Sequence, residues 1–76
     1  MNKDRRKRIT EINDAIEDLK AGLYSLAEEE REAYDNLPES IRDGEKGQRM
    51  AELADILDAA GNLLEDAQAE LYEIEL

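Results

Sequence analysis

The chain of 76 residues contains no cysteine and no histidine, and its aromatic residues are three tyrosines. Without cysteine no disulfide can form, and without thiolate or imidazole ligands a structural zinc site is excluded in practice. No apolar run reaches transmembrane length, and the first residues lack the apolar segment of a signal peptide. These absences predict a chain that neither enters a membrane nor needs a cofactor, and we expect it in the cytoplasm.

Basic residues are also scarce, since 10 of them face 21 acidic residues and give a formal charge of −11. Half of the basic residues fall between Lys3 and Arg8, whereas the chain after Arg49 carries acids and no base. Such a charge repels nucleic acid and anionic membranes and favours basic protein surfaces. We therefore expect no direct binding of nucleic acid. The basic N-terminal segment is instead expected to lie beside the acids near the C-terminus, with Arg8 opposite Glu75.

Apolar residues recur in alternating steps of three and four along two segments, which predicts two amphipathic helices. Pro38 cannot continue the first helix, and Asp43 or Gly44 can cap the second. The sequence predicts an all-α fold, a coiled-coil-like antiparallel two-helix hairpin in one domain (1–76). The expected helices are 3–35 and 45–75, with a loop at 36–44 that itself has room for one short helical turn.

The two apolar stripes can be aligned antiparallel without a mismatch, which favours a hairpin over two independent helices. The expected layers are Ile9 with Ile74, Ile12 with Leu71, Ile16 with Ala67, Leu19 with Leu64, Leu23 with Ala60, Leu26 with Leu57, Glu30 with Leu53, and Ala33 with Met50.

One further apolar strip lies beside these stripes, on the same side of the predicted hairpin. It consists of Ala15 and Gly22 on the first helix and of Ile56 and Leu63 on the second. A second hairpin would cover this strip and complete a four-helix bundle, so we expect a homo-oligomer, and a dimer above other stoichiometries. The alternative is a monomer with a few exposed apolar side chains.

Two groups of residues are candidate contacts for another protein. The first is a row of carboxylates on the outer face of the second helix, whose spacing resembles that of phosphates along duplex DNA: Asp55, Asp58, Glu65, Asp66 and Glu73. The second is the loop end, where Tyr34, Leu37 and Ile41 are apolar or aromatic. For most of the acids taken singly, the plainer interpretation is a solvated face that keeps the protein soluble.

A second set of acids, which also includes Asp55, has a spacing that is compatible with a magnesium site. Glu28, Glu32, Glu52 and Asp55, together with Glu29, match the pattern E-E-x-x-E … E-x-x-D of all-α nucleoside triphosphate pyrophosphohydrolases of the MazG type. Oxygen ligands suit Mg²⁺, and the metal suits phosphates. In the predicted alignment, however, these side chains point outward and do not converge, so we expect no metal, no catalytic residue and no enzymatic activity.

The segment Glu32–Ile41 (EAYDNLPESI), continued by Gly44–Gln48 (GEKGQ), resembles a box found in small acidic proteins of phages and prophages. Those proteins often carry serine as the helix cap where this chain has Gly44. The resemblance implies a phage accessory protein that binds a host protein, such as a defence or DNA-handling enzyme, in the host cytoplasm. It brings no catalytic residue with it.

The sequence thus favours a non-enzymatic protein-binding module, and the resemblance implies a phage-encoded inhibitor or modulator of a host protein. Acidic imitation of DNA is the mode of binding that the carboxylate row suggests. Two alternatives stay open. A structural or assembly coiled coil explains the apolar pattern equally well, and the pyrophosphohydrolase explains only the spacing of a few acids.

Overall fold

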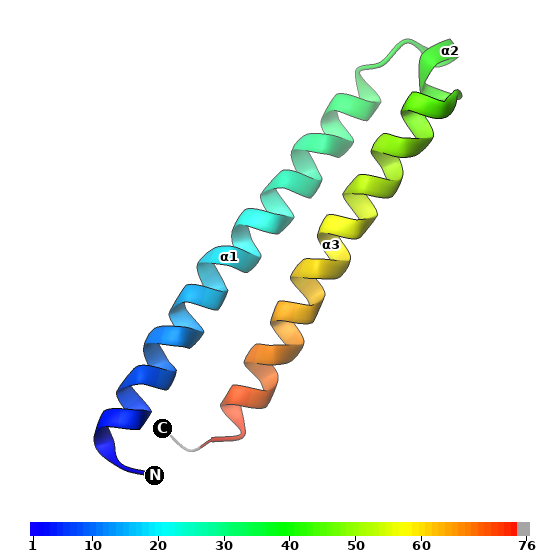
Figure 1. Ribbon diagram of the computed structural model, residues 1–76. Helices are drawn as coiled ribbons and strands as arrows, with labels where there is room; N and C mark the ends of the chain where they lie inside the picture. The colour runs from blue at the N-terminus through cyan, green and yellow to red at the C-terminus, as the bar shows by residue number, and fades with distance from the viewer. Residues whose placement is uncertain (75–76) are drawn as a thin grey trace.

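Two long helices make up most of residues 1–74, which are the residues that the computed structural model describes. They are α1 (Lys3–Asp35) and α3 (Glu45–Tyr72), and the short helix α2 (Glu39–Arg42) lies between them. The chain turns back on itself at α2, so the start of α1 and the end of α3 lie at the same end of the hairpin (Figure 1). The two predicted helices and the predicted helical turn in the loop are present, and α1 has the predicted bounds, whereas α3 ends at Tyr72, before the predicted residue 75.

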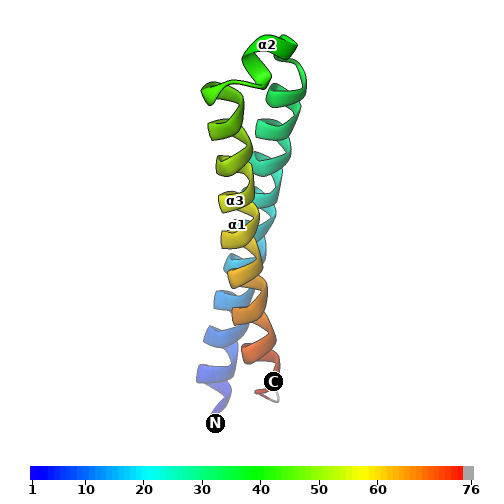
Figure 2. The same cartoon turned by 90° about the vertical axis from the view of Figure 1, so that its right-hand side faces the viewer.

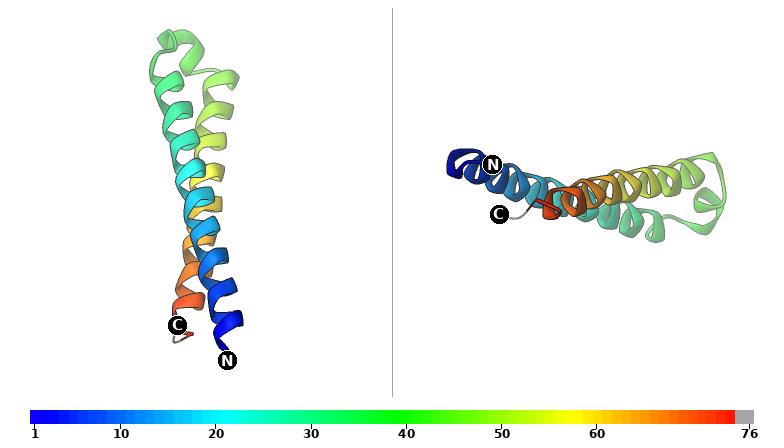
Figure 3. Two further views of the ribbon diagram at one scale, coloured as in Figure 1. Left: turned by 90° about the vertical axis from the view of Figure 1, so that its left-hand side faces the viewer. Right: turned by 90° about the horizontal axis from the view of Figure 1, so that it is seen from below.

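The hairpin is a thin rod of 59 × 15 × 11 Å. When the molecule is turned by 90° about its vertical axis, α3 lies in front of α1 and overlaps it (Figure 2). Seen from below, they cross at a shallow angle (Figure 3). None of the helices in residues 1–74 combines the length and the apolar character needed to cross a membrane.

The ends of the helices are fixed by local hydrogen bonds. The side-chain oxygen of Asn2 accepts a hydrogen bond of 2.8 Å from the backbone N–H of Arg5 and so caps α1. At the other end of α1, the backbone N–H of Asn36 donates to the carbonyl oxygen of Glu32, and that of Leu37 donates to the carbonyl oxygen of Tyr34. Helix α3 begins after Gly44, which has no side chain to cap it.

Small residues occupy the centre of the contact between the two long helices. On α3, the buried positions recur every seven residues: Gly47, Ala54, Gly61 and Gln68. On α1 the fully buried residue is Ala27, and the ring of Tyr24 lies directly over Gly61. A Cβ atom at position 61 would be 2.5 Å from Cε1 of Tyr24, so only glycine lets the ring lie there.

This arrangement corrects the predicted apolar layers. Ile12, Leu19 and Leu26, which were expected inside the hairpin, are 55, 62 and 51% exposed. The contacting stripe of α1 instead contains Ala27 and half-buried Asn13 and Lys20, each one residue later in the chain. The physical reason is that small residues, Ala27, Ala54 and Gly61, fill the centre of the contact. Larger apolar side chains do not fit between the helices there, so they lie to one side.

As a result, a single hairpin buries very little apolar surface. Among residues 1–74 the buried apolar residues are Ala27 and Ala54, and no large side chain is fully buried. Several larger residues beside the seam are only half-buried, namely Ile9, Ile16, Leu23, Leu57, Leu64 and Leu71. A protein of this size needs more burial than this to be stable, so the interior of one hairpin is an incomplete core.

The turn between α2 and α3 provides a test of the backbone packing. A Cβ atom at Gly47 would overlap the backbone carbonyl group of Arg42, which cannot move without shifting α2. We expect Gly47→Ala to lower the free energy of unfolding by about 1–3 kcal/mol, measured by chemical denaturation followed by circular dichroism.

The matched control is Gly44→Ala in the same turn. Its Cβ would meet the nearest atom, the carbonyl oxygen of Ile41, at 3.4 Å, and its backbone is extended, with φ −93°. Its effect should stay below about 1 kcal/mol. Equal losses for both variants would contradict the proposed backbone contact.

Candidate functional site

The hairpin has two unlike sides, and the first is an open apolar face. We define the apolar face as the side formed by Ala15, Gly22, Ile12, Leu19 and Leu26 on α1 and by Leu53, Ile56 and Leu63 on α3. All eight residues are exposed, and Leu63 is the most exposed of the larger ones at 69%. The predicted self-association residues Ala15, Gly22, Ile56 and Leu63 therefore belong to a larger apolar surface than the sequence suggested.

A groove of about 580 Å³ runs along this face. Leu19, Leu23 and Leu26 of α1 line it together with Leu64 of α3, and Gly22 lies at its edge. Residues seven apart share a line along each helix, so Ile12 continues the row of Leu19 and Leu26. The groove shows that apolar side chains from both helices meet on the same side of the hairpin.

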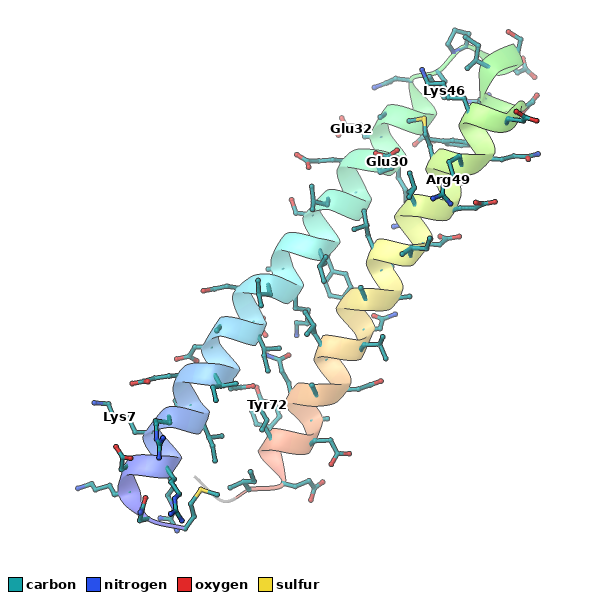
Figure 4. All side chains as sticks on the ribbon, viewed as in Figure 1. Lys7, Glu30, Glu32, Lys46, Arg49 and Tyr72 are labelled. Carbon is teal, nitrogen blue, oxygen red and sulfur yellow. The ribbon has the colours of Figure 1, made fainter. Side chains whose placement is uncertain are left out.

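The opposite side is closed by polar contacts between the helices, and we call it the polar face. The hydroxyl of Tyr24 donates a hydrogen bond of 2.6 Å to the side-chain oxygen of Asn62. Nearer the termini, Tyr72 reaches from α3 toward α1 (Figure 4), where the side-chain nitrogen of Asn13 donates to its hydroxyl oxygen at 3.5 Å. Burial, and then the negative charge of Glu65, raise the pKa of Tyr24 above its ordinary value.

A buried glutamine, Gln68, links two other side chains of the polar face. The amide oxygen of Gln68 accepts a hydrogen bond of 2.8 Å from Lys20, and its amide nitrogen donates to Glu17 at 2.8 Å. Lys20 and Glu17 are themselves 3.1 Å apart. The hydrogen bond from Gln68, followed by that from Lys20, lowers the pKa of the Glu17 carboxyl. All the polar atoms of this buried amide are satisfied, which the burial of a glutamine requires.

Arg31 binds two of the acids that the sequence assigned to partner binding. Its guanidinium lies 3.1 Å from Asp55 and pairs with Asp58 at 2.6 Å. Hydrogen bonds to Asp58 and then Asp55 raise the pKa of Arg31. These two carboxylates are therefore already neutralised in part within the hairpin. The remaining candidates Glu65, Asp66 and Glu73 are exposed.

At the loop end, the three candidate residues differ in exposure. Tyr34 and Leu37 are half-buried, whereas Ile41 is 43% exposed. A hollow of about 260 Å³ lies between Arg31, Tyr34 and Ala51. Of these three candidate contacts, Ile41 is therefore the most accessible to a partner.

The basic N-terminal segment makes few contacts with the rest of the hairpin. Arg8 pairs with Asp4 of its own helix at 3.2 Å, and Lys7 points away from α3 (Figure 4). The predicted neighbour of Arg8, Glu75, lies outside the described residues. Most of this basic charge is therefore exposed to solvent.

The magnesium pattern is not gathered into a site. Within residues 1–74, no group of three or more acids lies close enough together to hold a metal ion. Of the residues in the pattern, Asp55 pairs with Arg31, Glu52 lies 3.2 Å from Arg49, and Glu28 and Glu32 are exposed. The polar contacts of Lys20, Arg31 and Gln68 were not predicted. A signal for them was present in the sequence. Gly47, Ala54, Gly61 and Gln68 recur every seven residues, which places Gln68 on the same line of α3 as three small buried residues.

Comparison of the chain with models of protein families, with curated proteins and with solved structures finds no match.

The hydrogen bond of Tyr24 provides a test of the polar face. Tyr24→Phe removes the 2.6 Å contact with Asn62 but keeps the ring on Gly61. We expect the free energy of unfolding to fall by about 0.5–1.5 kcal/mol. Tyr72→Phe serves as the control, because the hydroxyl of Tyr72 is in an exposed, 3.5 Å contact. A larger loss for Tyr72→Phe than for Tyr24→Phe would contradict this assignment.

Proposed function

We propose that this chain is a non-enzymatic protein-binding module that acts as a four-helix bundle of two hairpins with acidic outer surfaces. The observation that carries the proposal is the segregation of the two faces. The polar face is already closed by Tyr24, Arg31 and Gln68, whereas the apolar face has no cover within one hairpin.

Burial of the apolar face accounts for the energy of assembly. Ile12, Leu19, Leu26, Ile56 and Leu63 are each between 51 and 69% exposed. Covering a side chain that is half-exposed contributes about 1 kcal/mol, so ten such residues in a dimer contribute about 10 kcal/mol. This is of the order of the entropic cost of association, ~4–15 kcal/mol. Half-buried Ile16, Leu23, Leu57 and Leu64 add to it when they become enclosed.

The charge distribution supports the same arrangement. Glu65, Asp66 and Glu73 are exposed and, on a helical wheel, lie away from the apolar face. Two hairpins joined by their apolar faces keep these carboxylates on the outside of the bundle, where their mutual repulsion is screened by solvent and salt. The outer surface then favours a basic protein surface of the kind that binds DNA.

The resemblance of the segment Glu32–Ile41 to a box of phage accessory proteins suggests where the partner is found. A bacterial host enzyme of defence or DNA metabolism has the basic surface that this acidic bundle suits. A purely structural role is the second candidate, and the same apolar face supports it, because assembly alone would bury that face.

Self-association is tested with two variants of α3. Each adds one carboxylate, the first within the apolar face and the second on the other side of the helix. Sedimentation of the unchanged chain at micromolar concentration should give about twice the chain mass of 8.7 kDa or more. Leu63→Glu places a charge within the apolar face and should yield monomers, because a buried unpaired carboxylate is costly.

The matched control is Ala69→Glu, which adds the same charge at an exposed position on the other side of α3. It should keep the mass of the unchanged chain. If the unchanged chain sediments as a monomer, the proposal of a two-hairpin bundle is wrong.

Partner binding is tested by a pull-down from bacterial lysate. Proteins retained by the unchanged chain should be released by duplex DNA and by ~0.5 M NaCl, where charges are screened beyond about 4 Å. The triple variant Glu65→Gln, Asp66→Asn, Glu73→Gln should lose these proteins while keeping its helicity.

The control variant Glu28→Gln, Glu32→Gln, Asp35→Asn changes the net charge by the same amount on α1 and should retain them. Retention by both variants in high salt would show that the acids of α3 only keep the protein soluble. The loop end around Tyr34, Leu37 and Ile41 would then be the surface to test.

A further inference from the structure

We infer that the two hairpins pack with their loops at the same end, so that Leu63 of each copy lies in the groove beside Gly22 of the other. The inference rests on the proposed self-association and adds the orientation of the two copies and the side chain that fills the groove.

The groove has room for a branched side chain from outside. It measures about 580 Å³, and Leu19, Leu23 and Leu26 line it. At its edge, a Cβ atom added to Gly22 would meet nothing within 4 Å. Leu63, at 69% exposure, is the most exposed of the large apolar residues within 1–74. The hairpin therefore presents both an empty apolar groove and a prominent apolar side chain.

The groove and the side chain lie at the same level along the rod. The ring of Tyr24 lies over Gly61, so these two residues are level with each other. Because the helices are antiparallel, Gly22, two residues before Tyr24, is level with Leu63, two residues after Gly61. On a helical wheel both residues lie at the outer edges of the apolar face, one on α1 and the other on α3.

A two-fold axis parallel to the helices leaves each residue at the same height along the rod in both copies. It also sets α1 of one copy against α3 of the other. Leu63 of each copy then meets Gly22 of the other, and both contacts form at once, as two-fold symmetry requires. Large residues thus face small ones, the condition for dense packing.

The opposite orientation has a poorer fit. With the loops at opposite ends and the two-fold axis at this level, Leu63 meets Leu63 and Gly22 meets Gly22. One contact is then overfilled and the other leaves a gap, and both effects are unfavourable.

The extent of the apolar face favours a second copy as its occupant. Ile12, Leu19, Leu26, Ile56 and Leu63 are 51–69% exposed, and burying both sets against each other contributes a free energy of the order of the cost of association. The arginines beside this face, Arg8 and Arg49, already pair with Asp4 and Glu52 of their own helices, so charge selects no orientation. The choice of orientation therefore depends on the fit of Leu63 to Gly22.

The absence of cysteine allows a direct test with single spin labels on the full chain. Ser40→Cys places one label on exposed α2, at the loop end. In the inferred dimer the two labels should be about 10–20 Å apart, one or two helix diameters. In the opposite orientation they should be separated by nearly the 59 Å length of the rod. Double electron–electron resonance measures this distance.

Lys3→Cys, at the other end of the rod, should also give a short distance. Ala21→Cys, near the middle, should give similar distances in either orientation and serves as the control. A short distance at both ends supports the inference. A dimer with long distances at both ends overturns it and leaves the proposed self-association intact, whereas a monomeric chain overturns both.

The fit of Leu63 is tested by filling the groove. A Cβ atom at position 22 would meet nothing within 4 Å, so the backbone has room for Gly22→Leu and the helices should form as before. It should raise the dissociation constant of the dimer roughly ten- to hundredfold, because the position of Leu63 is then occupied. Ala21→Leu adds a similar side chain at an exposed neighbouring position and should leave the constant within about threefold. An unchanged dimer in Gly22→Leu would refute the contact.

Discussion

The packing of the Tyr24 ring of α1 against the backbone of α3 at Gly61 is the contact on which the rest of the structure depends. The ring of Tyr24 occupies the space where a side chain of residue 61 would lie, and Ala27 and Ala54 are buried in the same seam. Small residues bring helices close together but contribute little apolar area of their own. The larger apolar residues consequently lie beside the seam, on one side of the hairpin.

The position of the seam also decides which charges are neutralised. Because Tyr24, Arg31 and Gln68 lie at one edge of the seam, their polar groups bridge the two helices on that side. Arg31 thereby offsets Asp55 and Asp58, which would otherwise repel the other acids of α3. Exposed ion pairs of this kind contribute little to stability. Their main effect is to distinguish the two faces, so that only one is left for apolar association.

The sequence was sufficient to predict the helices, the hairpin and the short turn, because Pro38 and the steps of three and four are local signals. The bounds of α1 agree with the predicted range of 3–35. The seam was harder to predict, because two adjacent apolar stripes on each helix compete for the same partner. Counting apolar residues favours the stripe of Leu19 and Leu26, whereas close packing favours the stripe of Ala27.

The candidate site was predictable to a similar degree. Ala15, Gly22, Ile56 and Leu63 are exposed, as an association surface requires, but the sequence did not show that Leu19 and Leu26 lie on the same open face. The pairing of Asp55 and Asp58 with Arg31 depends on which residues are level across the hairpin. That alignment follows from the contact between Tyr24 and Gly61. The contact joins two helices, so the residue pattern of either helix alone could not predict it.

The incomplete core has a consequence for how such a protein responds to its own concentration. Since no large apolar side chain of residues 1–74 is fully buried in one hairpin, much of the favourable burial becomes available only on association. If the hairpins associate as proposed, folding and assembly are coupled, and the stability of the helices rises with the concentration of the chain. In that proposed bundle the acidic outer surface opposes association beyond the apolar faces, because further copies would bring unpaired carboxylates together. Apolar attraction on one side and repulsion on the other would then favour a closed pair of hairpins over an open-ended assembly.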